Sequence, residues 1–444
     1  MKGITPDQLA SFEAAYDAVP AYRAVTNAVN QAGTSALMRA SDLEARMPLS
    51  FSIDIEAGKL TNQKASGRCW MFAALNTMRV RVMKKYNLKN MELSQNYLLF
   101  YDKLEKCNYF LETVLDTLDE ETSGRMIAWL MADPVSDGGQ WDMLANLIRK
   151  YGVVPKEAMP ESFVSSATRE INGWIKKKLR EFACTLRAMH ENGASAEDLQ
   201  SEKEKELTVI YRMLVMALGK PPKTFTWETR DEDKNFIRIA DITPQRFFSE
   251  VVEFPLDDYV SLINAPTADK PYGKSYTIRY LGNVAEGHIV KHLNLPAEEL
   301  KKLAIAQLSD GEVVWFGCDV GQFHDRTLGI MDTAGVRPDL LFDTPFAMDK
   351  AQRLDYGDSL MTHAMVFTGV NIGEDGKPDR WKVENSWGED RGRKGWYVMS
   401  DEWFSEYLYQ VVVNKKYLSA EQLAAYEAAP AVLAPWDPMG SLAE

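Results

Sequence analysis

The chain has 444 residues and a formal net charge of −13, from 51 Lys and Arg against 64 Asp and Glu. This acidic balance argues against a generic nucleic-acid-binding protein, because such proteins neutralise phosphates with clustered basic residues. The four cysteines are widely separated, so the sequence indicates neither a zinc site nor a disulfide framework. No stretch approaches the roughly 20 consecutive apolar residues of a membrane-spanning helix.

The first residues predict a capped amphipathic helix rather than a signal peptide. Thr5 can cap this helix, Pro6 suits its first turn, and apolar side chains recur at helical spacing from Leu9 to Val19. Scattered cysteines without a disulfide pattern are typical of a reducing compartment. We therefore expect a cytoplasmic protein.

The strongest candidate for catalysis lies between Asn62 and Met78, in the stretch NQKASGRCWMFAALNTM. From Cys69 onward this stretch predicts a helix, because it is largely apolar and contains neither Gly nor Pro. Cys69 would then lie at the amino end of the helix, where unpaired backbone N–H groups and the macrodipole stabilise a thiolate. Gln63 and the backbone N–H of Cys69 could donate to an oxyanion beside the sulfur. Taken alone, a cysteine at the start of an apolar helix is more often an inert buried residue.

A turn-rich segment at 133–141 contains two adjacent glycines, Gly138 and Gly139. Glycines permit positive φ angles and the close approach of another backbone. Because a Gly-Gly pair alone is typical of an ordinary loop, its role depends on the rest of the chain.

The middle of the chain predicts a helical hairpin. Apolar residues follow a 3.6-residue period from about Ala167, and again up to Lys220, where two prolines end the pattern. Segments with strand character return at 276–280 and 313–317. This order indicates a helical insertion between two halves of one protein.

Among the five histidines, His363 is the best candidate for a general base. It begins an apolar run with strand character, and the start of a strand would hold the ring rigidly beside a cleft. Asn385 follows within Asn-Ser-Trp-Gly, where its side-chain oxygen could accept the imidazole N–H. Trp387 of the same motif could shield that hydrogen bond from water. His324 is the reserve candidate.

His288 and His292 lie four residues apart, a spacing that can bind a metal. Neither an acidic pair nor cysteines accompany them, so we expect no metal site. Nucleophilic catalysis by a thiol and an imidazole also requires no organic cofactor, and we expect none.

These motifs together resemble the bleomycin hydrolase and aminopeptidase C branch of the papain-like cysteine peptidases. The resemblance rests on four matches in the family's order, at Gln63, Cys69-Trp, His363-Ala and Asn385-Ser-Trp-Gly. The chain departs twice from the general papain pattern. Ser66 replaces a cysteine that secreted members use in a disulfide, and Arg68 replaces a small residue.

The resemblance implies an α+β, papain-like two-lobe fold, with a helical left lobe, a β-rich right lobe, a helical insertion and two terminal arms. In chain order, the implied parts are an N-terminal arm at 1–50, a left lobe with the catalytic cysteine helix at 51–166, the helical insertion at 167–253, a right lobe with the histidine and asparagine at 254–428, and a C-terminal arm at 429–444.

The resemblance further implies a cysteine aminopeptidase that releases N-terminal residues from peptides through a thioester, and that also hydrolyses bleomycin-like amides. The implied catalytic residues are Cys69, His363, Asn385 and Gln63, and the implied substrate-binding residues are Gly138, Gly139, Trp387, Ala443 and Glu444. Family members form homohexamers, so a homohexamer is expected here. Two alternatives stay open, namely an endopeptidase relative and a catalytically silent interaction protein on the same fold.

The last residues, 429–444, contain three prolines, which forbid a regular helix and favour an extended path. A frayed terminus is the commoner explanation of such a tail. Yet the segment is apolar and nearly uncharged, unlike a solvated disordered tail. Its ending resembles the arm that family members lay into their own active-site cleft, where the terminal carboxylate would meet the substrate's α-ammonium. The working terminus would be Glu444, or Ala443 if the last residue is trimmed.

Overall fold

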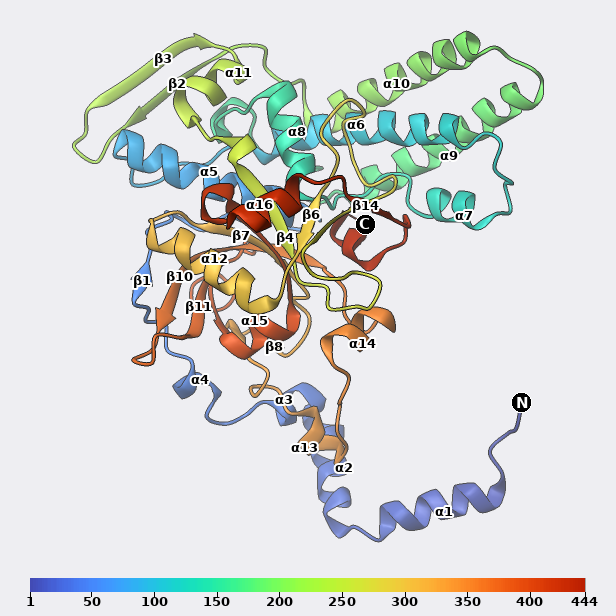
Figure 1. Cartoon of the computed structure of the whole chain (residues 1–444), viewed down its shortest axis with the longest axis vertical. Helices are drawn as coiled ribbons and strands as arrows, with labels where there is room; N and C mark the ends of the chain where they lie inside the picture. Colours follow the sequence, from blue (N-terminus) through green and yellow to red (C-terminus); the bar gives the residue numbers. More distant parts are fainter. Residues whose placement is uncertain (444) are drawn as a thin grey trace.

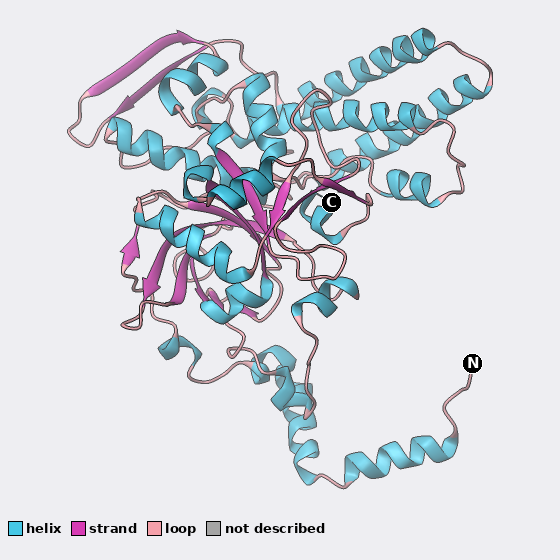
Figure 2. Cartoon of the chain, viewed as in Figure 1, coloured by secondary structure: helices cyan, strands magenta, loops and turns pink. Residues whose placement is uncertain are grey.

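The computed structural model of the chain describes residues 1–443. It has a helical lobe, a lobe built on a large sheet, and an amino-terminal arm that projects away from both (Figure 1). Figure 2 shows most strands gathered in the sheet lobe below the long helices. Within the described residues, no helix is long and apolar enough to cross a membrane.

The helices belong mainly to the arm, the helical lobe and the outer face of the sheet. They are α1 (Pro6–Asp17), α2 (Pro20–Ala32), α3 (Thr34–Met38), α4 (Leu43–Arg46), α5 (Cys69–Tyr86), α6 (Gln95–Asp116), α7 (Arg125–Ala132), α8 (Trp141–Tyr151), α9 (Arg169–Glu191), α10 (Ala196–Leu218), α11 (Pro244–Phe247), α12 (Ala297–Ser309), α13 (Pro338–Phe342), α14 (Lys350–Asp355), α15 (Asp401–Tyr407) and α16 (Ala420–Glu427).

The large sheet has the strand order β14-β5-β6-β4-β13-β7-β10-β11-β12-β9-β8, with β1 paired to β10, and β2 and β3 form a separate ribbon. The strands are β1 (Ile53–Asp54), β2 (Phe225–Arg230), β3 (Phe236–Ile242), β4 (Tyr259–Ile263), β5 (Lys274–Ile278), β6 (His292–Asn294), β7 (Val314–Cys318), β8 (His324–Asp325), β9 (Ile330–Met331), β10 (His363–Ile372), β11 (Pro378–Glu384), β12 (Trp396–Ser400), β13 (Leu408–Asn414) and β14 (Ala431–Leu433).

Helix α5 lies at the junction of the two lobes. Its side chains from Cys69 to Arg79 are all buried, which is typical of a helix that the core surrounds on every side. It packs against β10 and β7 of the sheet lobe. Trp315 on β7 donates its indole N–H to the backbone oxygen of Trp70, at 3.1 Å. The first turn of α5 is therefore held directly against the sheet.

The segment expected to be a helical insertion is only partly helical. Helices α9 and α10 form a hairpin, with Ser195 capping α10, and their buried stripes face α6. After Leu218 the chain instead forms the antiparallel ribbon of β2 and β3. Trp227 and Ile242 are the buried side chains of the ribbon, and Trp227 packs against Tyr86 and Phe247. Burial of one face of this ribbon on the helical lobe explains its strand conformation.

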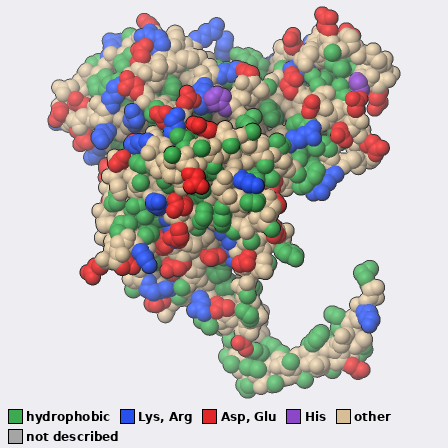
Figure 3. Space-filling model, viewed as in Figure 1, with side chains coloured by type: hydrophobic (Ala, Val, Ile, Leu, Met, Phe, Trp, Pro, Cys, Tyr) green, Lys and Arg blue, Asp and Glu red, His purple; other side chains and the backbone are tan. Residues whose placement is uncertain are grey.

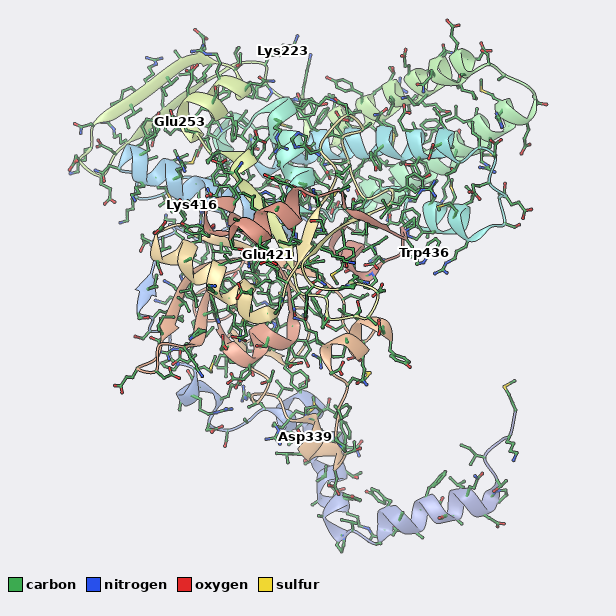
Figure 4. All side chains as sticks on the ribbon, in the orientation of Figure 1. Lys223, Glu253, Asp339, Lys416, Glu421 and Trp436 are labelled. Carbon is green, nitrogen blue, oxygen red and sulfur yellow. The ribbon has the colours of Figure 1, made fainter. Side chains whose placement is uncertain are left out.

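The amino-terminal arm, α1 to α3, buries none of its residues. The chain joins the main body at α4, where Leu43 and Met47 pack with Ile330 and Val398. In Figure 3 hydrophobic side chains cover much of the surface of the arm. Asp339, labelled in Figure 4, lies in α13, which packs against α3 of the arm.

A buried ion pair links α5 to the end of β11. The Arg79 guanidinium lies 2.6 Å from the Glu384 carboxylate, and both side chains are about 1% exposed. Asn76 donates to the same carboxylate oxygen at 2.7 Å. Because Glu384 directly precedes Asn385, this pair fixes the position of the candidate catalytic asparagine relative to α5.

We expect Arg79→Met to lower the free energy of unfolding by about 3–5 kcal/mol, because it leaves a buried carboxylate without its partner. Urea denaturation followed by tryptophan fluorescence measures this loss. The double variant Arg79→Met/Glu384→Gln should lose less, since it removes both charges. A single variant that loses less than about 1 kcal/mol, the value of an exposed pair, would contradict this role.

Candidate active site

Cys69 is the first residue of α5, and the turn before it is held by a buried arginine. The Arg68 side chain is fully buried and makes a two-pronged contact with the Glu161 carboxylate, at 3.1 and 2.8 Å. Its Nε also donates to Ser66 Oγ at 2.9 Å. The two positions that depart from the general papain pattern thus bond to each other and brace the turn that presents Cys69.

The His363 ring is held by Asn385. His363 Nε2 lies 2.9 Å from Asn385 Oδ1. The backbone N–H of Ser386 donates to the same oxygen at 2.7 Å, which fixes the orientation of the amide. Since an amide oxygen only accepts, Nε2 carries the proton and Nδ1 is left free to act as a base. The Trp387 ring packs on His363, with ring centroids 4.9 Å apart.

Cys69 and His363 meet where α5 packs on β10. Ala364, the residue after His363, lies close enough to Cys69 for its backbone N–H to help lower the pKa of the thiol. His363 also pairs across the sheet with Cys318 on β7, a strand that packs against α5 as well. The structure therefore brings together the candidate nucleophile, base and orienting amide.

Gln63 lies between the cysteine turn and the asparagine turn. Its Nε2 donates to the Ser66 carbonyl at 2.6 Å, and its Oε1 accepts from Ser386 Oγ at 2.6 Å. Its backbone N–H also donates to the Ser386 carbonyl at 2.8 Å. A side-chain amide has two N–H donors, so the second hydrogen of Nε2 stays available for an oxyanion.

Burial opposes charge on both reacting groups. It raises the pKa of the Cys69 thiol to about 11, against hydrogen bonds from the backbone N–H groups of Ala364, Trp70 and Cys69 itself, which lower it. Burial also lowers the pKa of His363 to about 4, and the hydrogen bond to Asn385 acts in the opposite direction. Between these values the pair keeps one proton, which can pass from sulfur to imidazole without any change in net charge.

The carboxyl-terminal segment lies on the glycine pair. The Gly139 N–H donates to the Leu442 carbonyl at 3.0 Å, and Ser136 Oγ donates to the Ala443 carbonyl. A Cβ on Gly138 would lie 2.3 Å from the Leu442 oxygen, and one on Gly139 would lie 2.5 Å from the Trp70 indole. Glycine is therefore required at both positions. Glu444 lies outside the described residues.

The rest of the tail is packed rather than frayed. Strand β14 pairs in parallel with β5. Asp437 forms an ion pair with the buried Lys270 at 2.9 Å, and Met439 is fully buried. Trp436, labelled in Figure 4, receives the Arg125 guanidinium over its ring at 3.8 Å. These contacts hold the tail in the position from which it reaches the glycine pair.

Asp137 is a site residue that sequence analysis missed. Its carboxylate accepts from the backbone N–H of Gly67 at 3.0 Å and contacts Lys103 Nζ at 2.6 Å. Asn172 of α9 and Thr168 also donate to it. Burial alone would raise the pKa of this carboxyl, but Lys103 and the hydrogen bonds hold it well below its usual range. In the sequence, this role is indicated only by the position of Asp137 before the Gly-Gly pair, because the residues that contact its carboxylate are far away along the chain.

The other histidines do not join the Cys69 site. His324 Nδ1 bonds to the Val320 carbonyl at 2.9 Å, and its ring lies near Trp387 and Tyr397. His292 is buried in the sheet, where it bonds to Ser261. Within residues 1–443, no group of three or more His, Cys, Asp or Glu side chains could hold a metal ion.

A cysteine at a helix start, beside a histidine held by an asparagine between a helical and a sheet lobe, is the arrangement of a papain-like cysteine peptidase. The profile described as "Peptidase C1-like family" matches residues 3–440. The chain belongs to this family. The expected α+β, papain-like fold is therefore confirmed.

Relatives and a solved structure match along nearly the whole chain. An aminopeptidase C of Streptococcus thermophilus is 50% identical and covers 100% of both chains. A bleomycin hydrolase of Homo sapiens is 45% identical and covers 92% of this chain and 91% of its own. A crystal structure of pepw from Lactobacillus rhamnosis has a TM-score of 0.97 and 52% identity, with 99% of each chain covered. These matches confirm the resemblance inferred from the motifs.

We expect iodoacetamide to alkylate Cys69 at a rate that is constant from about pH 5 to 8, because the Cys69–His363 pair keeps one proton across that range. The rate should fall below about pH 4, where His363 gains a second proton. Mass spectrometry of the Cys69 peptide measures it. Free glutathione, an ordinary thiol, should instead react about tenfold faster for each pH unit up to about 8.5.

His363→Ala should abolish the plateau, whereas His324→Ala should keep it. Cys184 is the exposed cysteine among the four, so Cys184→Ser serves as the background for labelling. If the plateau survived in His363→Ala, or were lost in His324→Ala, the assignment of His363 as the base would be wrong.

Proposed function

We propose that the protein is a cysteine aminopeptidase that removes residues from the free amino end of peptides. The observation that carries the proposal is the contact of Leu442 and Ala443 with the glycine pair beside the Cys69 helix. The relatives named aminopeptidase C support it. The human relative, named bleomycin hydrolase, supports bleomycin-like amides as further substrates.

The mechanism follows from the geometry of the thiol, imidazole and amide groups. Cys69 transfers its proton to His363 Nδ1 and attacks the scissile carbonyl carbon, while Asn385 holds the ring through Nε2. The oxyanion accepts hydrogen bonds from the Cys69 backbone N–H and Gln63 Nε2, and loss of one such donor typically costs about 10²–10³ in rate.

The proton on His363 then passes to the leaving amine, which departs and leaves a thioester on Cys69. His363 next takes a proton from water, and the resulting hydroxide attacks the thioester. Release of the acid restores the thiol. Water supplies the hydroxide that becomes part of the released acid, and His363 returns the proton taken from water to the Cys69 sulfur.

The tail limits the enzyme to the amino end by obstruction. A cleft glycine N–H normally binds the main chain of a bound peptide, but here the Leu442 carbonyl takes the Gly139 N–H. A substrate can therefore extend only a short way past Cys69 on that side. The buried Met439 and Leu442 side chains support a tail that stays in place during turnover.

We expect deletion of 441–444 to open the cleft, so that N-blocked peptides become substrates and the preference for a free amino end falls. The anchors at β14 and Asp437 remain in this variant, so the rest of the tail should keep its position. Fluorogenic aminoacyl substrates with free and acetylated amino groups measure the preference.

The same deletion in a Cys69→Ala background controls for contaminating proteases. Cleavage of N-blocked substrates by the full-length enzyme would favour the alternative of an endopeptidase. Absence of hydrolysis of any peptide would favour a catalytically silent interaction protein.

A cytoplasmic location forms part of the proposal. All four cysteines are free thiols, which supports a reducing compartment.

The proposal also excludes nucleic acid as a partner, because the net charge of −13 makes the chain a poor candidate for nucleic-acid binding.

We further propose that the chain assembles as a homohexamer. The support is the apolar surface of the arm, because exposed apolar patches of this kind usually mark interfaces. The large apolar side chains exposed on the arm include Ile4, Leu9, Phe12, Tyr16 and Leu37, and those on the neighbouring α13 segment are Leu340, Phe342 and Phe346.

We expect sedimentation equilibrium to give six chains of 50.2 kDa, about 300 kDa. The double variant Leu9→Asp/Phe12→Asp should sediment as a smaller species, because it places charges in a buried apolar interface. A full-length protein that sediments as a monomer at micromolar concentration would contradict the assembly.

A further inference from the structure

A positively charged pocket lies beside the candidate catalytic histidine. Its volume is about 260 Å³, and its lining residues are Asn62, Lys64, Arg326, Trp387 and Arg391. Three of these five side chains are cationic, and none is acidic. The three cations come from separate segments of the chain, before α5, after β8 and after the Asn-Ser-Trp-Gly motif.

Trp387 separates the pocket from the His363 ring and contacts both. The Arg326 guanidinium carbon lies 5.6 Å from the centroid of the Trp387 ring, and that ring lies 4.9 Å from the His363 ring. The positive charge of Arg326 also contributes, after burial, to the lowered pKa of His363. Arg326 is therefore close enough to His363 to affect its charge.

The cations of the pocket have no carboxylate partner within residues 1–443. Neither Lys64, Arg326 nor Arg391 forms an ion pair there. Asp325, the nearest acidic residue in sequence to Arg326, accepts from two backbone N–H groups and contacts Arg39 instead. Like charges that gather without forming ion pairs repel one another, and a bound anion would relieve that repulsion.

The backbone at the pocket rim is held in a demanding conformation. Lys64 has φ +56°, in the left-handed region that a residue with a side chain rarely adopts. Its backbone N–H donates to Asn62 Oδ1 at 2.9 Å, and Asn62 pairs in turn with Trp387. This bonding fixes the segment from which the Lys64 side chain projects, so the cationic lining is built into the site.

The chemistry of the reaction determines which part of a substrate reaches this pocket. The tail occupies the Gly139 side of the cleft. The part of the substrate that acylates Cys69 therefore ends at the tail. His363 gives its proton to the leaving nitrogen, so the atoms beyond the scissile bond begin at His363 and Trp387. One extended residue spans about 3.5 Å of backbone, and its side chain reaches further. The second residue of the substrate therefore lies beside the pocket.

We propose that the pocket of Lys64, Arg326 and Arg391 binds a carboxylate on the leaving part of the substrate. The inference rests on the proposed aminopeptidase function and adds a specificity to it. Guanidinium groups bind carboxylates through paired hydrogen bonds, and Trp387 forms an apolar wall for the intervening carbons. The carboxylate has two sources, an acidic side chain on the second residue or the α-carboxylate of a dipeptide.

Four matched substrates separate these sources. Ala-Glu-amide against Ala-Gln-amide tests the acidic side chain, and Ala-Ala against Ala-Ala-amide tests the α-carboxylate. Chromatography of released alanine gives kcat/KM for each. We expect at least one carboxylate member to exceed its neutral partner by about tenfold, the size expected for a charge-assisted hydrogen bond. The ratio should shrink as salt concentration rises.

The variants Arg326→Gln and Arg391→Gln should bring that ratio close to one. Both side chains are exposed and unpaired in the described chain, so the variants should fold. Lys302→Gln is the matched control, because it removes one charge from an exposed position on α12, outside the pocket, and should leave the ratio unchanged.

The outcomes distinguish this inference from the function on which it rests. If none of the four free-amine substrates is cleaved, the aminopeptidase proposal fails. If all four are cleaved with ratios near one, only the pocket proposal fails. A tenfold ratio that persists in both arginine variants would also overturn the pocket, because the preference would then arise elsewhere.

Discussion

The site depends on how the amino end of α5 is held against the start of β10. Helix α5 packs on β10, and the Ala364 N–H of that strand helps to lower the pKa of the Cys69 thiol, so the helix and the strand meet near the reacting atoms. Two buried charge contacts hold this junction from either side. Arg68 with Glu161 braces the turn before the cysteine, and Arg79 with Glu384 braces the strand before Asn385. A buried pair is costly to break, so it tolerates little displacement of the groups it joins.

Burial at this junction also determines which charges the reacting groups can carry. Burial opposes both a thiolate and an imidazolium, yet the backbone N–H groups of Ala364, Trp70 and Cys69 lower the pKa of the thiol and the hydrogen bond to Asn385 raises the pKa of the ring. In the proposed mechanism the two charges of the reactive pair therefore form together, by one proton transfer from Cys69 to His363. Asp137 completes the arrangement, because it ties the cysteine turn, the glycine pair and α9 together.

The tail and the cationic pocket bear on opposite parts of the substrate. The Leu442 carbonyl accepts from the Gly139 N–H, and in the proposed function this contact and the bulk of the tail exclude a longer peptide. The pocket beyond Trp387 acts through charge, in a protein whose net charge is −13. A cluster of cations in an acidic protein attracts anions more selectively than a uniformly basic surface would. By these two proposals, the tail selects substrates by length and the pocket selects them by charge.

The amino-acid sequence by itself determined the family, the helix that starts at Cys69, the strand that starts at His363 and the helical hairpin after Ala167. These features depend on periodicity, capping and short motifs, which act over a few residues. Only the tertiary structure decided the contacts of Asp137, the ribbon of β2 and β3, the packing of the tail on Gly138 and Gly139, and the grouping of Lys64 with Arg326 and Arg391. Each of these joins segments far apart in the chain, and their pairing depends on complementary shape and charge that no local pattern contains.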